Sequence, residues 1–227
     1  MQDKNDSLKR KIYSEILDGI IKGHFSLDQF INEGELAEKY NVSKGPIREA
    51  LIELCSEKIL RSIPRVGYQI IQLTEKNVKE ATELRLMLEL SGLKKALPII
   101  NESALNSLSR LNKEYEIHAG KNPLTIEQHW EYNIHFHLLL NSYAGNSYMN
   151  DVLSNTLKLI RRAYVQLYSE TDHDEYISTD LSRHIEMEKA LRKKEFEKAF
   201  DLLKSDILFI KGKLFVPSDD IITFQSN

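Results

Sequence analysis

Cysteine and long apolar runs are nearly absent from this chain of 227 residues. The single cysteine, Cys55, excludes a disulfide-stapled scaffold, and we interpret it as a buried, small apolar side chain. No apolar run approaches the ~20 residues that a membrane-spanning helix needs. No apolar signal-peptide core follows the polar N-terminus. We therefore expect a cytoplasmic protein with no membrane partner.

The chain also lacks the excess of positive charge that is typical of nucleic-acid-binding domains. It holds 31 Lys and Arg against 34 Asp and Glu, for a net charge of −3. Residues 1–72 contain 11 basic and 11 acidic side chains. Any DNA binding must therefore depend on where individual Lys and Arg side chains stand, and dimerisation would help it.

The most informative stretch is residues 34–51, which predicts a helix, a tight turn and a second helix. From Leu36 onward its apolar residues recur at the spacing of one helix face. Ser43 is a natural N-cap, because its hydroxyl can accept from the free N–H groups of the next turn. The second helix carries Lys44 and Arg48 opposite its apolar side. This arrangement is typical of a helix-turn-helix that enters a major groove.

Residues 8–22 predict an amphipathic helix that ends at a glycine and completes a three-helix core. After the second motif helix, two β-prone runs flank a turn at residues 64–67 and predict a hairpin. A hairpin in this position is the wing of a winged helix. Arg65 and Gly67 at its tip suit a backbone that comes close to DNA; the alternative for Gly67 is a simple turn glycine. We assign residues 1–72 to this domain.

From Thr74 onward the periodicity is helical and no strand-like alternation returns. A capping box at Thr125 and the helix-breaking residues Pro98 and Gly145 separate successive helices. Short connections predict an antiparallel bundle over residues 73–216, followed by a tail at residues 217–227. The six predicted helices span residues 74–97, 101–118, 125–144, 146–168, 176–192 and 195–213.

Several motifs resemble a known family. Residues 35–37, 42–51 and 64–67 resemble the winged helix of the GntR family of bacterial transcription regulators, with Lys where the family usually has Arg at position 44. Residues 83–89, 133–138, 144–146 and 184–191 resemble the ligand-binding domain of its FadR subgroup, called the FCD type. The resemblance implies a homodimer, a double-stranded DNA operator and a small carboxylic or sugar acid as effector. The DNA contacts that it implies come from Lys44, Gly45, Arg48, Arg65 and Gly67.

The same resemblance implies a metal site in the helical domain. Metal-binding FCD members have an Asp, a His four residues later, and two further His from later helices. Here Asn133, His137, His184 and Asp206 occupy these positions. Asn133 replaces the expected Asp, and Asp206 replaces the third His. The two replacements together keep the formal ligand charge at −1. Two imidazoles with oxygen ligands suit Zn²⁺ or Ni²⁺, and harder ligands favour ions such as Mn²⁺. The alternative is a polar effector pocket without metal.

Other polar residues receive simpler interpretations. Arg161 and Arg162 lie on a helix that could line the bundle interior, where an arginine would pair with an effector carboxylate. Arg85 and Glu89, four residues apart, predict a structural ion pair. His135 is out of phase with its neighbour at 137 and is expected to face elsewhere. Histidines at loops or helix ends are expected in solvent: His24, His118, His129 and His173.

These observations predict a mainly α protein. An N-terminal winged helix-turn-helix, built from three helices and a β-hairpin, precedes an all-α antiparallel bundle of the FCD type. The predicted function is a transcription regulator, most simply a repressor, and not an enzyme. Two alternatives stay open at this point. One is a helical-bundle metalloenzyme built on Asn133, His137, His184 and Asp206, against which no obvious general base stands with them in a Glu-x-x-His or His-Glu-x-x-His arrangement. The other is an interaction adaptor whose winged helix no longer binds DNA.

Overall fold

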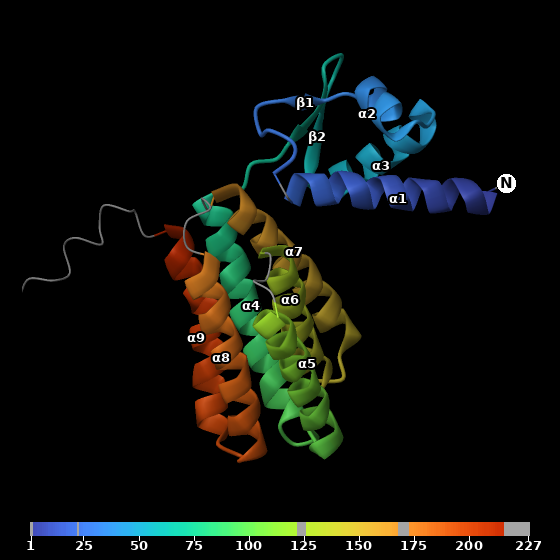
Figure 1. Cartoon of the computed structure of the whole chain (residues 1–227). Helices are drawn as coiled ribbons and strands as arrows, with labels where there is room; N and C mark the ends of the chain where they lie inside the picture. The colour runs from blue at the N-terminus through green and yellow to red at the C-terminus, as the bar shows by residue number, and fades with distance from the viewer. Residues whose placement is uncertain (1, 22, 122–125, 168–172, 216–227) are drawn as a thin grey trace, which may run out of the picture. The chain divides into compact units, whose positions relative to one another are not determined.

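The computed structural model describes residues 2–21, 23–121, 126–167 and 173–215, and it divides the chain into two compact units (Figure 1). The first unit runs from Met1 to Leu73 and the second from Thr74 to Asn227. The elements described in the first unit are α1 (Gln2–Ile21), β1 (Phe30–Ile31), α2 (Glu33–Tyr40), α3 (Lys44–Ser56), β2 (Leu60–Ile63) and β3 (Gly67–Ile70).

The N-terminal unit contains a small antiparallel sheet with the strand order β1-β3-β2. β2 and β3 form the predicted hairpin, in which Ile63 pairs with Gly67. Sequence patterning does not reveal the third strand, because two residues are too few to show an alternation. This strand, β1, pairs Ile31 with Tyr68, and it therefore ties the entry of α2 to the wing.

The helices of this unit enclose one apolar core. α1 packs against α3, and the apolar residues that recur at helical spacing on both are buried. Each such aliphatic side chain contributes roughly 1.5–3 kcal/mol on burial. The buried positions on the two helices are Ile12, Ile16, Ile20, Ile47, Leu51 and Leu54.

Two asparagines define the ends of α2. The side chain of Asn32 accepts a hydrogen bond from the N–H of Gly34 at 2.7 Å and so caps the helix start. Asn41 ends the helix with a φ of 51°, a left-handed conformation that Asn tolerates better than most residues. Ser43 occupies the predicted N-cap position of α3, but its hydroxyl makes no capping hydrogen bond.

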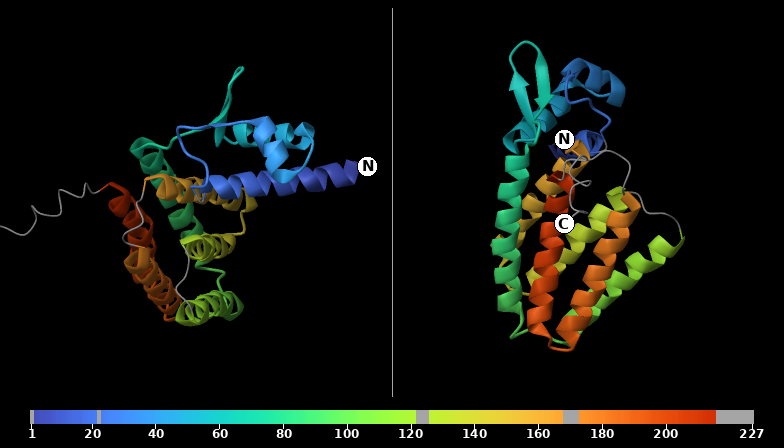
Figure 2. Two further views of the ribbon diagram at one scale, coloured as in Figure 1. Left: turned by 45° about the horizontal axis from the view of Figure 1, so that its top comes forward. Right: turned by 90° about the vertical axis from the view of Figure 1, so that its left-hand side faces the viewer.

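The second unit is a helical bundle, as predicted, and six helices are described in it. Thr74 caps the first helix through a capping box with Asn77. α4 packs against both α7 and α9 (Figure 2). The helices are α4 (Glu75–Ala96), α5 (Glu102–Lys121), α6 (Ile126–Ser142), α7 (Ser147–Leu167), α8 (His173–Arg192) and α9 (Phe196–Phe215).

The bundle interior holds two apolar clusters. One contains the buried aromatic residues Trp130 and Tyr164, whose ring centroids lie 5.6 Å apart at 61°. The other joins apolar residues of α4, α5, α6, α8 and α9. Gly92 of α4 lies against the side chain of Asn141 of α6. A Cβ atom at position 92 would lie 1.9 Å from the Oδ1 atom of this asparagine. The absence of a side chain therefore permits the close approach of these helices.

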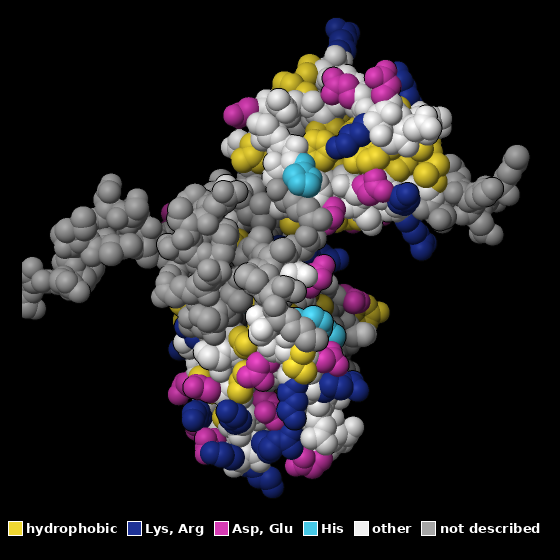
Figure 3. Space-filling view, viewed as in Figure 1, with side chains coloured by type: hydrophobic (Ala, Val, Ile, Leu, Met, Phe, Trp, Pro, Cys, Tyr) yellow, Lys and Arg dark blue, Asp and Glu magenta, His cyan; other side chains and the backbone are white. Residues whose placement is uncertain are grey.

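The surface of the second unit carries charges of both signs. Figure 3 shows Lys and Arg side chains interspersed with Asp and Glu on its visible face. Within the described ranges, no helix combines the length and apolar character needed to span a membrane. The predicted tail at residues 217–227 and the predicted capping box at Thr125 lie outside the described residues.

Candidate DNA-binding face and metal centre

The second motif helix, α3, separates its polar and apolar residues cleanly. Lys44, Gly45 and Arg48 are exposed, whereas Ile47 and Leu51 are fully buried. The predicted DNA-contacting residues of this helix therefore share the solvent side. They lie in its first turns, the part of a recognition helix that contacts base edges.

Arg48 is held by a carboxylate of α2. Its Nη2 lies 2.7 Å from Oε2 of Glu33, and its Nε lies 3.0 and 3.1 Å from the two carboxylate oxygens. The hydroxyl of Tyr68 on β3 donates to Oε1 of the same carboxylate at 3.0 Å. Hydrogen bonds from Arg48 lower the pKa of Glu33, although partial burial opposes this shift. The arginine that sequence patterning selects is therefore paired, yet its side chain remains 59% exposed.

The wing tip contains two unusual backbone conformations. Arg65 has a φ of 65°, a left-handed conformation that is uncommon for a residue with a side chain. Gly67 has a φ of 143°, and a Cβ there would lie 2.7 Å from the carbonyl oxygen of Ile31 in β1. Packing within the unit therefore requires glycine at position 67, whether or not DNA approaches it. Arg65 is exposed, as a residue that meets DNA must be.

Three of the four predicted metal ligands meet inside the bundle. His137 of α6, His184 of α8 and Asp206 of α9 are all buried, and one ligand atom from each lies within 4.8 Å of the others. Oδ2 of Asp206 lies 3.0 Å from Nε2 of His137 and 3.7 Å from Nε2 of His184. Two imidazoles and a carboxylate form a donor set that suits Zn²⁺ and other divalent transition metals.

The first histidine is oriented from behind by a second carboxylate. Nδ1 of His137 lies 2.5 Å from Oε2 of Glu89 on α4, so Nε2 is directed towards Asp206. Nε of Arg85 binds the other oxygen of Glu89 at 2.6 Å, and this confirms the predicted ion pair as a fully buried one. A carboxylate on the outer nitrogen of a ligating histidine is the usual support of a metal site.

The charges of this cluster balance one another. Burial lowers the pKa of His137, but the carboxylates of Glu89 and Asp206 raise it to about 9. Burial raises the pKa of Asp206, but His184 and His137 hold it well below its ordinary value. The negative charge of the buried Asp206 carboxylate can therefore be balanced either by a proton on His137 or by a divalent metal ion. These residues fit a metal ion.

The second histidine is oriented by a hydroxyl and an aromatic ring. Nδ1 of His184 lies 3.1 Å from the hydroxyl of Tyr132, which donates to Oδ1 of Asn112 at 2.9 Å. The imidazole also stacks on Phe136, with centroids 3.8 Å apart and planes inclined by 7°. Both histidines therefore have their Nδ1 atoms engaged by neighbouring helices, and this leaves the two Nε2 atoms on the Asp206 side.

The remaining predicted site residues lie on α6 and α7. Asn133 is fully buried one turn before His137 on the same helix. Arg162 is 6% exposed and burial lowers its pKa, whereas Arg161 is half-buried. His135 is exposed and faces away from the cluster, as predicted.

The sequence-based prediction of solvent exposure is wrong for one histidine. His129 is fully buried, and its Nδ1 lies 2.6 Å from the hydroxyl of Tyr115. It was expected in solvent because it stands near a helix start, but α6 begins at Ile126 and places it on the interior side beside Trp130. Glu89, Tyr132 and Glu33 are missed as functional partners because their contacts join residues that are distant in the chain.

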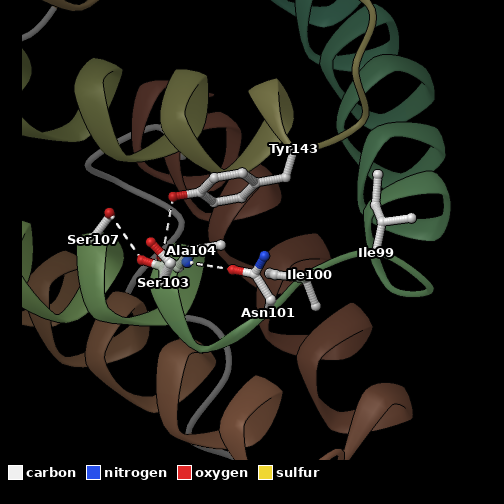
Figure 4. Close-up of a pocket in the computed structure, with 7 residues that line it drawn as sticks. All are labelled: Ile99, Ile100, Asn101, Ser103, Ala104, Ser107 and Tyr143. Atoms are coloured by element: carbon white, nitrogen blue, oxygen red, sulfur yellow. Dashed lines mark hydrogen bonds between the residues drawn. The ribbon is translucent and has the colours of Figure 1, made fainter.

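A separate pocket of about 280 Å³ opens where α5 begins (Figure 4). Two hydrogen bonds join its lining residues. The hydroxyl of Tyr143, which follows the last residue of α6, donates to the carbonyl of Ala104 at 3.1 Å, and the N–H of Ala104 donates to Oδ1 of Asn101 at 3.0 Å. None of the predicted site residues lines it. The lining residues are Ile99, Ile100, Asn101, Ser103, Ala104, Ser107 and Tyr143.

Comparison with known sequences identifies both units. The family model for bacterial regulatory proteins of the GntR family matches residues 8–70, and the model for the FCD domain matches residues 80–208. An uncharacterized HTH-type transcriptional regulator of Bacillus subtilis (strain 168), YdhC, is 29% identical over 199 residues, which cover 87% of this chain and 86% of that protein. The gluconate operon transcriptional repressor of the same organism is 29% identical over 151 residues, which cover 65% of this chain and 59% of that protein.

Solved structures share the fold at low sequence identity. McbR/YncC of E. coli superposes with a TM-score of 0.74 at 18% identity, covering 92% of this chain and 97% of that chain. A GntR transcriptional regulator from Rhodococcus sp. RHA1 gives a TM-score of 0.68 at 20% identity, with the same two coverages. The matched families are transcription regulators and not enzymes, so the metalloenzyme alternative is removed. The chain therefore belongs to the GntR family of bacterial regulatory proteins, in the FadR-type group with an FCD domain, and it is a DNA-binding transcription regulator.

Proposed function

We propose that this regulator is a homodimeric repressor whose affinity for a palindromic operator is controlled by a small carboxylate in the FCD domain. A divalent metal ion, held by His137, His184 and Asp206 with Asn133 as a further oxygen ligand, would bind the carboxylate. The observation that carries the proposal is the buried cluster itself, because two oriented imidazoles and a carboxylate converge in the effector domain. Like other bacterial DNA-binding regulators, the protein would act in the cytoplasm.

The metal would be Zn²⁺ or Ni²⁺ on the basis of the two nitrogen ligands, with Mn²⁺ as the alternative that oxygen ligands favour. A metal that keeps an open coordination position can bind a carboxylate oxygen of the effector directly. Arg161 and Arg162 on α7 are the proposed cationic partners of that carboxylate, since arginine pairs with carboxylates in a bidentate manner. The name of the gluconate operon repressor suggests gluconate as one candidate effector to test.

The operator contacts are proposed for Lys44, Gly45 and Arg48 of α3 and for Arg65 and Gly67 of the wing. Their support is exposure on the helix and wing that this fold directs to DNA. Lysine at position 44 provides a point charge and not a bidentate fork, so it suits a phosphate contact. Replacing Arg48 by Ala should weaken operator binding about tenfold or more, the size of one bidentate base contact.

The proposed dimer surface lies on α4 and α7, two helices that pack against each other. Large apolar side chains on them face solvent in the single chain: Leu84 and Met87 on α4, and Tyr148 and Val152 on α7. An exposed apolar patch of this kind marks an interface. We expect Met87→Asp to shift the protein from dimer to monomer in sedimentation equilibrium. Ile117→Asp is the control, because Ile117 is 56% exposed on a different helix, α5.

The metal is tested by elemental analysis of the protein purified without a histidine tag. We expect about one Zn, Ni or Mn per wild-type chain. Asp206→Asn keeps the shape of the side chain but removes the charge, and it should lose the metal together with His137→Ala and His184→Ala. A metal content unchanged in all three variants, or an absence of metal with no thermal shift on adding these ions, would reject the metal site.

The effector is tested on the metal-loaded protein. Gluconate, lactate and citrate are added to a complex with an operator duplex, and release of DNA is followed by fluorescence anisotropy. Effector and operator binding are reciprocally linked, so an acid that releases DNA must itself bind less tightly to the DNA-bound form. If an acid still releases the DNA after the metal has been removed, then a polar pocket without metal binds the effector.

A further inference from the structure

The guanidinium of Arg48 has two edges that can each make paired hydrogen bonds, one formed by Nε and Nη2 and the other by Nη1 and Nη2. Glu33 occupies the first edge with contacts of 2.7, 3.0 and 3.1 Å. Among the hydrogen bonds of the described residues, none involves Nη1 of Arg48. The edge that remains open is therefore the outer one, at the tip of the side chain.

The carboxylate that occupies the inner edge is itself held in place. Glu33 follows the N-cap Asn32 in the first turn of α2, where a negative charge is favoured by the helix dipole. Tyr68 donates to Glu33 Oε1 at 3.0 Å, and only 9% of this tyrosine is exposed. The tyrosine is fixed by the β1–β3 pairing through Ile31. Arg48 is thus connected to the core of the unit through two side chains.

Stability alone is a weak reason for this arrangement. An ion pair with an exposed partner contributes little to stability, and Arg48 is more than half exposed. A carboxylate beside a DNA-contacting helix also repels phosphates and so lowers the affinity for any DNA. A free arginine, however, loses side-chain rotamer entropy when it is fixed on a base. Fixing it beforehand removes much of that loss and favours one geometry.

We infer that Glu33, anchored by Tyr68, is a positioning residue that presents the outer Nη1–Nη2 edge of Arg48 to the O6 and N7 atoms of a guanine. The inference rests on the proposed DNA contact of Arg48. Glu33 touches no base. Its charge weakens binding to all DNA, whereas its hydrogen bonds strengthen the preference for the operator over other sequences.

The test compares two duplexes of equal length with the full-length protein. One is selected by the wild-type protein from a randomised pool, and the other is a random sequence; both are titrated by fluorescence anisotropy at one salt concentration. Glu33→Gln keeps the side-chain size but removes the charge and the second acceptor. We expect the ratio of selected to random affinity to fall about tenfold, the size of one impaired base contact. Affinity for the random duplex should stay equal or rise.

Two variants separate position from charge. Glu38→Gln makes the same charge change at an exposed site of α2, and it should raise both affinities together without changing their ratio. Tyr68→Phe keeps the charge of Glu33 and removes only its anchor, so the ratio should fall while random-DNA affinity stays constant. Thermal unfolding of each variant establishes that the fold is retained.

Arg48→Ala separates the proposed DNA contact of Arg48 from the proposed positioning role of Glu33. If this variant lowers the affinity ratio but Glu33→Gln behaves like Glu38→Gln, then Arg48 contacts DNA and the positioning role of Glu33 is wrong. If Arg48→Ala leaves the ratio unchanged, the proposed contact itself fails. In the double variant Glu33→Gln/Arg48→Ala, the ratio should fall no further than in Arg48→Ala alone, and a fully additive fall would overturn the inference.

Discussion

The carboxylate of Glu89 provides the sharpest test of the proposed metal centre. It joins two buried groups, with Oε2 at 2.5 Å from His137 Nδ1 and Oε1 at 2.6 Å from Arg85 Nε. Glu89→Gln preserves the volume and can still accept one hydrogen bond from His137. The substitution removes the negative charge of Glu89, which orients the imidazole of His137 and raises the basicity of that imidazole. We therefore expect the variant to bind metal more weakly without losing any ligand.

The magnitudes follow from burial. Loss of an outer partner of a ligating histidine typically weakens metal binding about 10- to 100-fold, which is roughly 1.4–2.8 kcal/mol. Arg85 and Glu89 have side-chain exposures of 0% and 2%, so removing one partner of this pair should also lower the free energy of unfolding by about 3–5 kcal/mol. The combined variant Arg85→Met/Glu89→Gln removes both charges and should recover most of that stability while metal affinity stays low.

The assay is competition for Zn²⁺ between the untagged protein and a chromogenic chelator, with thermal unfolding measured by circular dichroism on the same samples. Glu188→Gln is the matched control, because Glu188 also pairs with an arginine four residues away, and among the described residues its side chain makes no hydrogen bond or ion pair with a proposed ligand. It should bind Zn²⁺ like the wild type. If folded Glu89→Gln binds Zn²⁺ within twofold of the wild-type affinity, the outer-partner reasoning is refuted.

Four further substitutions test the packing and the residues that orient the proposed metal ligands. Gly92→Ala should lower the unfolding free energy by about 1–3 kcal/mol, because the new methyl group overlaps the α6 asparagine in contact with it; a rise in thermal stability would show that helix propensity prevails. Gly67→Ala should destabilise the N-terminal unit through its contact with β1, whereas Gly45→Ala should stabilise it by up to ~1 kcal/mol, both measured by thermal unfolding. Tyr132→Phe should weaken Zn²⁺ binding less than Glu89→Gln in the chelator assay, because it removes an uncharged partner; an equal or greater loss would contradict this.

Periodicity explains why much of the fold could be predicted. The six helices of the bundle and the buried faces of α1 and α3 follow from apolar residues at helical spacing, which is a local property of the chain. β1 has only two residues, and its pairing with β3 depends on a partner more than thirty residues away. No local pattern encodes such a contact. The prediction for His129 is wrong for a related reason, because its burial depends on Tyr115 of another helix and not on its place near a helix start.

The candidate site shows the same division. Residues 133, 137, 184 and 206 could be selected because their types and spacing match a family pattern. The partners that orient them could not. Arg85 and Glu89 are recognisable as an i,i+4 pair, but nothing local indicates that the carboxylate also reaches His137 on another helix. Sequence reasoning therefore predicts only a structural pair, and the contact of Glu89 with His137 is visible only in the fold.

The chain has no excess of positive charge, and the structure shows where some of its carboxylates are used. In each unit a carboxylate stands behind a side chain of proposed function: Glu33 behind Arg48, and Glu89 behind His137. The second carboxylate lies on α4, which begins at Glu75, two residues after the last residue of the DNA-binding unit. A ligand that shifts His137 must act on Glu89 and hence on α4. Because binding linkage is reciprocal, replacing Glu89 should alter how strongly the effector changes operator affinity, as well as how tightly the metal is held.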